Sequence, residues 1–272
     1  MITISYKSAH IFGPSVFMAL SVVAYPAHGM DQFEIQVYAD DLNRPGRFGL
    51  ETHLNYTIDG HRTPAYAGEQ PPNHVSRVTI EPALGLTEFM ELGGYVQNMI
   101  NGDGHYKFSG VKLRGKFVLP KRYTANFFFG INVEFGRVPK AVEEAGWANE
   151  FRPIVGFYDG RWLFDVNPIV GYALSGPNKF KPEFEPAAKV GYNTQKGFML
   201  GAEYYAGLGL LASPSPLGQQ EHLFFLAFDL ADASVEDPSV EQPWELNVGI
   251  GKSLTEATPQ QWIAKAIVGY SF

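Results

Sequence analysis

The sequence predicts an all-β fold: a single transmembrane antiparallel up-and-down β-barrel of about 12 strands, preceded by a cleaved signal peptide. Three observations support this prediction. Apolar side chains alternate with polar or small ones in many segments, and the last of these segments ends in Phe272. The 272 residues include 29 Gly, 21 Phe and 14 Tyr, which are residue types that barrel walls use. The chain has no Cys, so an exported form cannot depend on disulfide bonds.

Residues 1–29 have the features of a signal peptide. Lys7 is their only charged residue, an apolar run extends from Ile11 to Ala24, and residues 27–29 (Ala-His-Gly) resemble a cleavage site. The apolar run is too short and too interrupted to be a membrane anchor. Loss of Lys7 changes the formal net charge from −7 to −8, which disfavours a nucleic-acid partner. We therefore expect an exported protein that is acidic overall.

Alternation with period two defines the expected strands. In segment 123–136, Tyr123, Phe127 and Phe135 fall on one face, whereas Asn132 and Glu134 fall on the other. This alternation lasts longer than a usual strand of a soluble protein. The final strand has aromatic and small apolar residues on one face up to Phe272, a pattern typical of bacterial outer-membrane proteins. The expected strands are 46–58, 75–87, 89–99, 106–119, 123–136, 148–158, 161–173, 184–194, 197–209, 220–230, 243–252 and 261–272.

The gaps between these strands alternate between tight and long, which predicts short periplasmic turns and longer extracellular loops. The tight gaps fall near residues 87–88, 120–122, 159–160 and 195–196. Segment 231–242 is the exception, because it should be a periplasmic turn but is long and acidic. Residues 33–39 also alternate, but a thirteenth strand would break the even count. We therefore expect residues 30–45 to form a plug in the periplasmic mouth, with an extension of the first strand as the alternative, and residues 46–272 to form the barrel.

Charged side chains of the expected strands take the phase opposite to the apolar face. A Lys or Arg on the lipid face costs about 2–4 kcal/mol at the membrane midplane, so these charges must point inward. They form either an ion-pair lattice that rigidifies a narrow barrel or a polar conduit whose selectivity they set, and a twelve-stranded barrel allows both. The predicted pore-lining residues are Glu51, His53, Arg77, Glu81, Lys112, Arg114, Lys116, Glu134, Arg152, Asp165, Asn167, Glu185, Lys189, Glu203, Glu245 and Lys265.

Three cations of this set, Lys112, Arg114 and Lys116, share one phase of one strand and therefore stack along one side of the lumen. We call them the cation row. The row favours anionic solutes locally. Acidic residues on other strands oppose it, so the sequence does not fix the net selectivity.

Four prolines fall inside expected strands, each on the outward phase: Pro82, Pro153, Pro168 and Pro186. Proline removes a donor of the sheet and usually lies on an edge strand or at a bulge, but a closed barrel has no edge. One interpretation is a set of bulges that kink the wall. The other is a weakened lateral seam through which a hydrophobic solute leaves sideways into the membrane.

Six stretches carry a resemblance to a known family: FEIQVY at 33–38, PGRFGLETHLNY at 45–56, EPALGLTEFMELG at 81–93, GVKLRGKFV at 110–118, RPIVG at 152–156 and WLFDVNPIV at 162–170. Together they resemble the outer-membrane channel family named for a MetA pathway of phenol degradation. The likeness is spread over nearly all of the mature chain. It implies a monomeric twelve-stranded barrel that acts as a passive channel, and the family name suggests hydrophobic or aromatic solutes. No catalytic residue comes with the resemblance.

We therefore predict an outer-membrane channel of a Gram-negative bacterium for passive uptake of small solutes. The alternatives are a structural or adhesive barrel without conduction and, less favoured, an outer-membrane hydrolase. The sequence contains no His-Glu-x-x-His and no Gly-x-Ser-x-Gly motif, so we expect no enzyme activity. The spacing of the loop histidines indicates no metal site, and we expect no cofactor. Expected partners are outer-membrane lipid, the solute, and the barrel-assembly machinery, which would bind the C-terminal strand that ends in Phe272.

Overall fold

A computed structural model describes residues 31–176, 178–230 and 243–272 of the chain. The predicted signal peptide (residues 1–29) and the acidic segment 231–242 lie outside these described residues. Within them, no helix is both long enough and apolar enough to cross a membrane. The two helical elements are short 3-10 turns, η1 (Lys121–Tyr123) and η2 (Leu217–Gln219).

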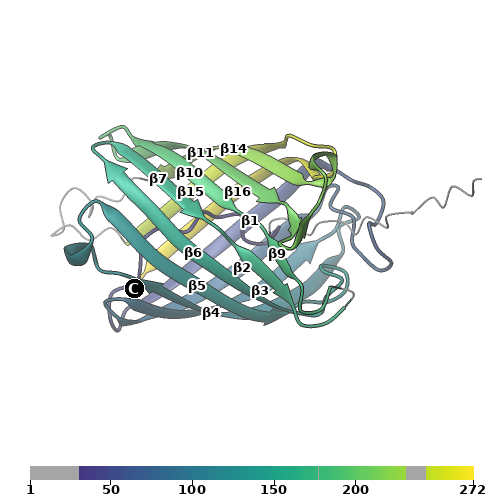
Figure 1. Ribbon diagram of the computed structural model, residues 1–272, viewed down its shortest axis with the longest axis horizontal. Coiled ribbons are helices and arrows are strands. Elements are labelled where there is room, and N and C mark those ends of the chain that lie inside the picture. The colour runs from purple at the N-terminus through teal and green to yellow at the C-terminus, as the bar shows by residue number, and fades with distance from the viewer. Residues whose placement is uncertain (1–30, 177, 231–242) are drawn as a thin grey trace, which may run out of the picture.

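The described residues form one antiparallel sheet that closes on itself (Figure 1). Its segments are β1 (Phe48–Gly60), β2 (Ser76–Thr87), β3 (Met90–Ile100), β4 (Tyr106–Val118), β5 (Phe127–Arg137), β6 (Trp147–Asp159), β7 (Trp162–Asn167), β8 (Val170–Ala173), β9 (Pro182–Phe184), β10 (Ala187–Asn193), β11 (Phe198–Gly207), β12 (Gly209–Leu210), β13 (Ser213–Pro214), β14 (Glu221–Leu230), β15 (Trp244–Ser253) and β16 (Gln260–Ser271).

The barrel closes because β1 pairs with β2 on one side and with β16 on the other, so that Leu50 lies opposite both Pro82 and Tyr270. In the described residues these segments amount to twelve wall strands. β7 and β8 are two consecutive parts of one wall strand, and the same holds for β9 and β10 and for β11 and β12. β13 only adds a short hairpin to β12. The prediction of an all-β barrel of about 12 strands is therefore confirmed.

The strand boundaries agree with the sequence pattern to within a few residues, with one larger difference. The strand expected at 123–136 begins only at Phe127. The chain before it forms η1, and Ala125 adopts a left-handed conformation with φ of 54°, so residues 119–126 make a longer turn than expected. Alternating apolar residues alone could not show this, because Tyr123 and Ala125 continue the apolar phase of β5 in the sequence although both lie outside the strand.

The outer face of the barrel is apolar and carries aromatic residues toward both rims, as outer-membrane barrels do. At the rim where β16 ends, the rings of Phe48 and Phe272 lie 5.8 Å apart and those of Trp244 and Tyr270 lie 4.7 Å apart. The backbone N–H of Phe272 donates to the carbonyl of Phe48 at 2.7 Å, so the last residue is tied to the first strand. A closed barrel with this outer face belongs in the bacterial outer membrane.

The connections assign the two rims. Residues 61–75 and 138–146 form longer loops at one rim, as do the described residues between Ala173 and Pro182, whereas residues 88–89 and 160–161 form tight turns at the other. Outer-membrane barrels place the short turns in the periplasm, which makes the rim that carries the chain end Phe272 the periplasmic rim (left in Figure 1).

Candidate functional site

A non-strand segment, residues 31–44, runs through the lumen, and we call it the luminal segment. Polar groups of the wall satisfy its backbone. The Tyr38 N–H donates to Oδ1 of Asn167 at 2.7 Å, and Nδ2 of Asn167 donates back to the Tyr38 carbonyl at 3.0 Å. Arg152 and Lys265 donate to the carbonyls of Gln36 and Ile35 at 3.0 and 2.9 Å. Side chains rather than a sheet ladder therefore hold the segment in place.

The luminal segment is not confined to the periplasmic mouth, where the sequence placed it. Asp31 at one end pairs with Lys112, next to the extracellular loops. At the other end the Asn43 N–H donates to Glu91 at 2.8 Å, near the periplasmic rim. Nor does it extend β1, because the described residues before Phe48 form no strand. Whether the segment acts as a plug stays a prediction.

The sixteen predicted pore-lining residues all take the inward phase of the wall; fifteen lie in strands, and Glu185 lies in the interruption between β9 and β10. Their side chains are buried or half-buried, whereas wall neighbours such as Leu54, Leu113 and Val166 are exposed on the outside. The structure brings many of them into contact across the lumen, through ion pairs that no strand pattern could show. Their role in lining a conducting path stays a prediction.

Each member of the cation row is neutralised by carboxylates. Lys112 pairs with Asp31 and, at 3.2 Å, with Glu134. Arg114 donates to Glu81 at 2.5 Å and to Glu91 at 2.7 Å. Lys116 pairs at 3.0 Å with Asp41. Two of these partners, Asp31 and Asp41, belong to the luminal segment. The segment therefore completes the charge balance of the row, which reduces the local preference for anions that the sequence suggested.

A second ion network lies across the lumen from the cation row. Lys265 pairs with Glu203, which also accepts from Lys189 at 3.3 Å, and Lys189 pairs with Asp229 at 2.6 Å. Such buried networks stabilise a fold only when every charge has a partner. The network and the cation row together give a lattice of the kind that the sequence allowed.

The interior also contains an apolar cluster that the alternation of the strands does not predict. Ile35 and Val37 of the luminal segment are buried against inward-facing residues of the wall. Those wall residues are Ile169, Ala187, Tyr205, Leu223, Phe225 and Ile263. The sequence does contain apolar residues at inward positions, but the strand pattern alone does not show which side chains would pack against them. One side of the lumen is thus lined by apolar surface that the segment covers.

Three of the four strand prolines form a row across adjacent strands. β6 pairs with β7 and with β8 in one continuous register across the interruption at residues 168–169. This register places Pro153 directly opposite Pro168. The registers of β10 with β7 and of β9 with β8 likewise place Pro168 opposite Pro186. Because these registers do not shift, no extra residue is inserted between β6 and the strand of Pro168, and the bulge interpretation fails for Pro153 and Pro168. On the far side of Pro186 the register shifts by one residue, from Ala187 opposite Tyr205 to Glu183 opposite Leu210, so a bulge does adjoin the strand of Pro186.

The pattern of hydrogen bonds shows what this proline row removes. The Leu174 N–H donates to the Trp147 carbonyl, which makes odd-numbered residues of β6 the ones that bond toward β7 and β8. Pro153 and Pro168 would therefore exchange two bonds, and both are lost because neither residue has an N–H. The wall lacks its usual ladder at this level, and β7 and β8 are separate segments as a result. Pro82, in β2, has no such neighbour and lies on another part of the wall.

Two chambers remain inside the barrel, one on each side of the luminal segment. The periplasmic chamber has a volume of about 500 Å³ and is lined from the segment and from the turn end of the wall. The extracellular chamber has a volume of about 180 Å³ and is lined from the segment, the wall and the loops. No described residue lines both chambers, so residues between Phe33 and Gln36 separate them.

The chambers differ in charge. Among described residues, the extracellular chamber is lined by nine carboxylates and two cations, Arg77 and Lys112. The periplasmic chamber is lined by seven carboxylates and five cations. In the extracellular loops, burial raises the pKa of Glu143 to about 7, so this carboxyl changes its charge near neutral pH.

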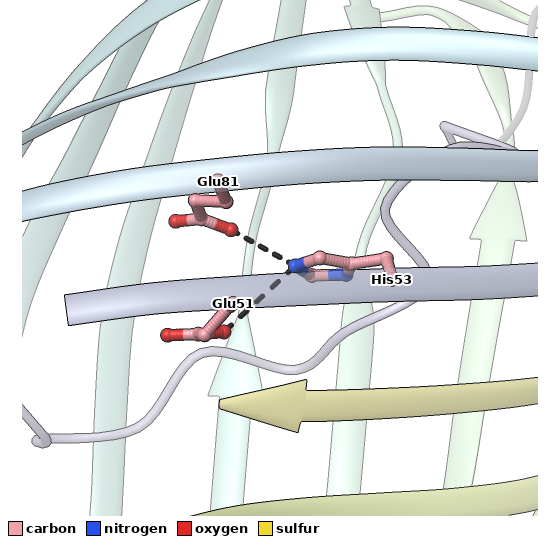
Figure 2. Close-up of side chains that lie close together, drawn as sticks. All are labelled: Glu51, His53 and Glu81. Atoms are coloured by element: carbon pink, nitrogen blue, oxygen red, sulfur yellow. Dashed lines mark hydrogen bonds and ion pairs between the residues drawn. The ribbon is translucent and has the colours of Figure 1, made fainter. Parts of the chain in front are cut away.

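At the wall of the periplasmic chamber, Glu51, His53 and Glu81 converge, with one potential ligand atom each within 4.8 Å of one another (Figure 2). This cluster could not be recognised as a metal site in the sequence, because Glu81 lies on a different strand from Glu51 and His53.

Solved structures of outer-membrane channels have the same fold. The COG4313 outer membrane channel of Pseudomonas putida F1 matches with a TM-score of 0.57 and 11% identity, over 88% of this chain and 100% of that chain. The KdgM porin matches with a TM-score of 0.51 and 10% identity, over 82% and 99%. The NanC porin matches with a TM-score of 0.50 and 7% identity, over 82% and 98%. No family model and no curated protein matches the sequence.

Proposed function

We propose that the chain is an outer-membrane channel for passive uptake of small solutes through a mixed-charge lumen. The observation that carries the proposal is that hydrogen bonds to side chains of the wall, and not a sheet ladder, hold the segment that lies between the two chambers. Displacement of the luminal segment would join the chambers without breaking any bond of the wall. In this proposal residues 31–44 act as a plug that limits conductance.

The sixteen inward-facing residues predicted from the sequence would then line the path that the segment uncovers. In the closed form many of them are paired with one another or with the segment. In the open form Lys112 and Lys116 would lose Asp31 and Asp41 as partners, and the cation row would face the solute. The charged residues would thus form an ion-pair lattice when the luminal segment is in place and a polar conduit when it is displaced.

The apolar cluster supports hydrophobic or aromatic compounds as solutes. When Ile35 and Val37 leave, an apolar surface that includes Phe225 and Ile169 becomes available to a solute of similar size. Ile169 follows Pro168 in the chain, so this surface adjoins the proline row. In the proposal, the row is the lateral seam by which such a solute passes from the lumen into the membrane.

The apolar outer face makes outer-membrane lipid the surrounding partner of the barrel. We further propose that the chain acts as a monomer, and that the barrel-assembly machinery binds the last strand, β16, before it pairs with β1. The pairing of Phe272 with Phe48 would follow as the barrel closes.

A structural barrel without conduction is the second candidate, and the buried ion networks favour it. Single-channel recordings in planar bilayers, with swelling of liposomes that contain the purified mature protein, separate the two candidates. The channel proposal expects discrete conductance steps and solute-dependent swelling. Sealed bilayers and unswollen liposomes, obtained with protein that is shown to be folded by heat-modifiable mobility, would favour the structural barrel.

A further inference from the structure

We propose that the wall of the periplasmic chamber contains a binding site for one divalent transition-metal cation, with Glu51, His53 and Glu81 as ligands. The first argument is their arrangement on the sheet. Glu51 in β1 lies directly opposite Glu81 in β2, and both side chains point inward. Like charges at directly opposed positions destabilise a sheet. His53 lies two residues further along β1, on the same face.

A third carboxylate extends the same level of the wall. On its other side Glu51 lies opposite Gly269 of β16, and Gly269 lies opposite Glu245 of β15. A Cβ on residue 269 would come within 2.9 Å of the Glu51 side chain and 3.1 Å of the Glu245 side chain. The glycine therefore leaves the space in which the two carboxylates approach each other. We call Glu81, Glu51 and Glu245 the acidic row.

The acidic row has too little positive charge. Arg114 contacts Glu81 at 2.5 Å, but it shares its guanidinium with Glu91. Oε2 of Glu51 is buried and has no hydrogen-bond partner among the described residues, and His53 Nε2, which lies nearer to Glu81, is 3.8 Å from it. A buried carboxylate without a partner is unfavourable unless a cation or a proton compensates for it. A divalent cation between Glu51 and Glu81 would supply the missing charge.

The distances suit a transition metal. His53 Nε2 lies 2.9 Å from Oε2 of Glu81 and 3.8 Å from Oε2 of Glu51 (Figure 2). In a tetrahedral zinc site, neighbouring ligand atoms are about 3.3 Å apart, which lies between these two values. One imidazole nitrogen with carboxylate oxygens is a donor set for Zn²⁺ and not for Mg²⁺ or Ca²⁺, which prefer oxygen ligands only. Glu51 and Glu245 line the periplasmic chamber, which gives the ion a route of entry.

The site would also affect the barrel itself. Its ligands come from β1 and β2, and Glu245 comes from β15. The strands lie in the order β2, β1, β16 and β15, so the pair that closes the barrel, β1 with β16, lies between Glu81 and Glu245. A ligand that binds only the folded state stabilises it in proportion to the logarithm of its concentration. Bound Zn²⁺ should therefore raise the unfolding temperature of the barrel.

The test uses purified mature protein treated with a chelator, then equilibrium dialysis against Zn²⁺ and thermal unfolding with and without Zn²⁺. We expect one saturable Zn²⁺ per barrel and a higher Tm, with no rise in Tm from Ca²⁺. Glu51→Gln and His53→Gln should each weaken Zn²⁺ binding by about 10-fold or more and abolish the rise in Tm. Oε2 of Glu51 has no hydrogen-bond partner among the described residues, so the barrel should still fold with Glu51→Gln.

Glu183→Gln is the matched control, because Glu183 is a buried lumen carboxylate of the extracellular chamber and its contact with Asn178 needs only an oxygen acceptor. It should bind Zn²⁺ as the wild type does. Gly269→Ala tests the geometry without removing a ligand, and it should weaken binding. The proposal is wrong if the wild type has no saturable site, or if Glu51→Gln and His53→Gln bind Zn²⁺ as tightly as Glu183→Gln. None of these outcomes depends on whether the barrel conducts.

Discussion

The extracellular and periplasmic chambers lie in one lumen, yet their linings differ. The extracellular chamber is the smaller, and carboxylates from loops and wall dominate its lining. The periplasmic chamber is the larger, and cations such as Arg44, Arg47 and Lys189 balance much of its negative charge. In the proposed channel, a solute from outside would meet a strongly acidic space first and a more neutral space second. We therefore propose that the extracellular chamber selects solutes by charge and that the luminal segment between the chambers limits their passage.

The largest effect should follow from removing loop carboxylates at the extracellular chamber. The triple variant Glu69→Gln, Glu143→Gln and Glu144→Gln should lower the cation-to-anion permeability ratio several-fold, because a ring of like charge sets the selectivity of a pore. Reversal potentials in a salt gradient measure this ratio. The double variant Glu51→Gln and Glu245→Gln, in the periplasmic chamber, should change it less. An equal change in both variants would remove the distinction between the chambers.

The next largest effect should come from the proline row, which tests whether a solute can leave the lumen sideways through the wall. Pro153→Ala with Pro168→Ala restores two wall donors that face each other, and it should reduce uptake of apolar solutes while leaving small polar solutes unaffected. Liposome assays with one solute of each kind measure the difference. Pro82→Ala restores a donor elsewhere in the wall and serves as the control. Unchanged uptake of both solutes in the double variant would exclude a lateral seam at this row.

The smallest effect should be a dependence on pH. Burial raises the pKa of Glu143 to about 7, so this group is mostly neutral at pH 6 and mostly charged at pH 8. The extracellular chamber therefore gains negative charge as the pH rises, and the cation preference of the wild type should increase from pH 6 to pH 8. Glu143→Gln should flatten this increase. A preference that falls with rising pH would contradict the assignment.

The sequence predicted the wall well and the site only in part, for a physical reason. Alternation with period two is local, so residues such as Lys265 and Glu203 could be assigned to the inner face without a structure. Contacts between strands depend on register, which no single strand contains. The tight turn at residues 159–160 predicts that Pro153 and Pro168 lie within a few residues of the same level, and the pairing of strands places them directly opposite. A long loop joins β1 to β2, so that Glu51 faces Glu81 follows only from the pairing of strands.

The luminal segment was the least predictable part. Its alternation at residues 33–39 resembled a strand, but its backbone is satisfied by side chains of Asn167, Arg152 and Lys265, which are distant in sequence. For the same reason, the inward Phe225 and Ile263 had no evident function until Ile35 was seen to cover them.

The central claim is that the luminal segment, and not the wall, limits passage between the chambers. Its most direct test is the single-channel conductance of the mature barrel without residues 31–44, compared with the full mature chain. Asn167→Leu is the companion variant, because it removes both bonds to Tyr38 and keeps the segment. Asn247→Leu, which alters a lumen amide that contacts Glu203 and Asp229 instead, is its control.

We predict a several-fold larger conductance for the deletion and more frequent openings for Asn167→Leu, with Asn247→Leu similar to the full chain. A folded deletion variant that conducts no better than the full chain would contradict the account.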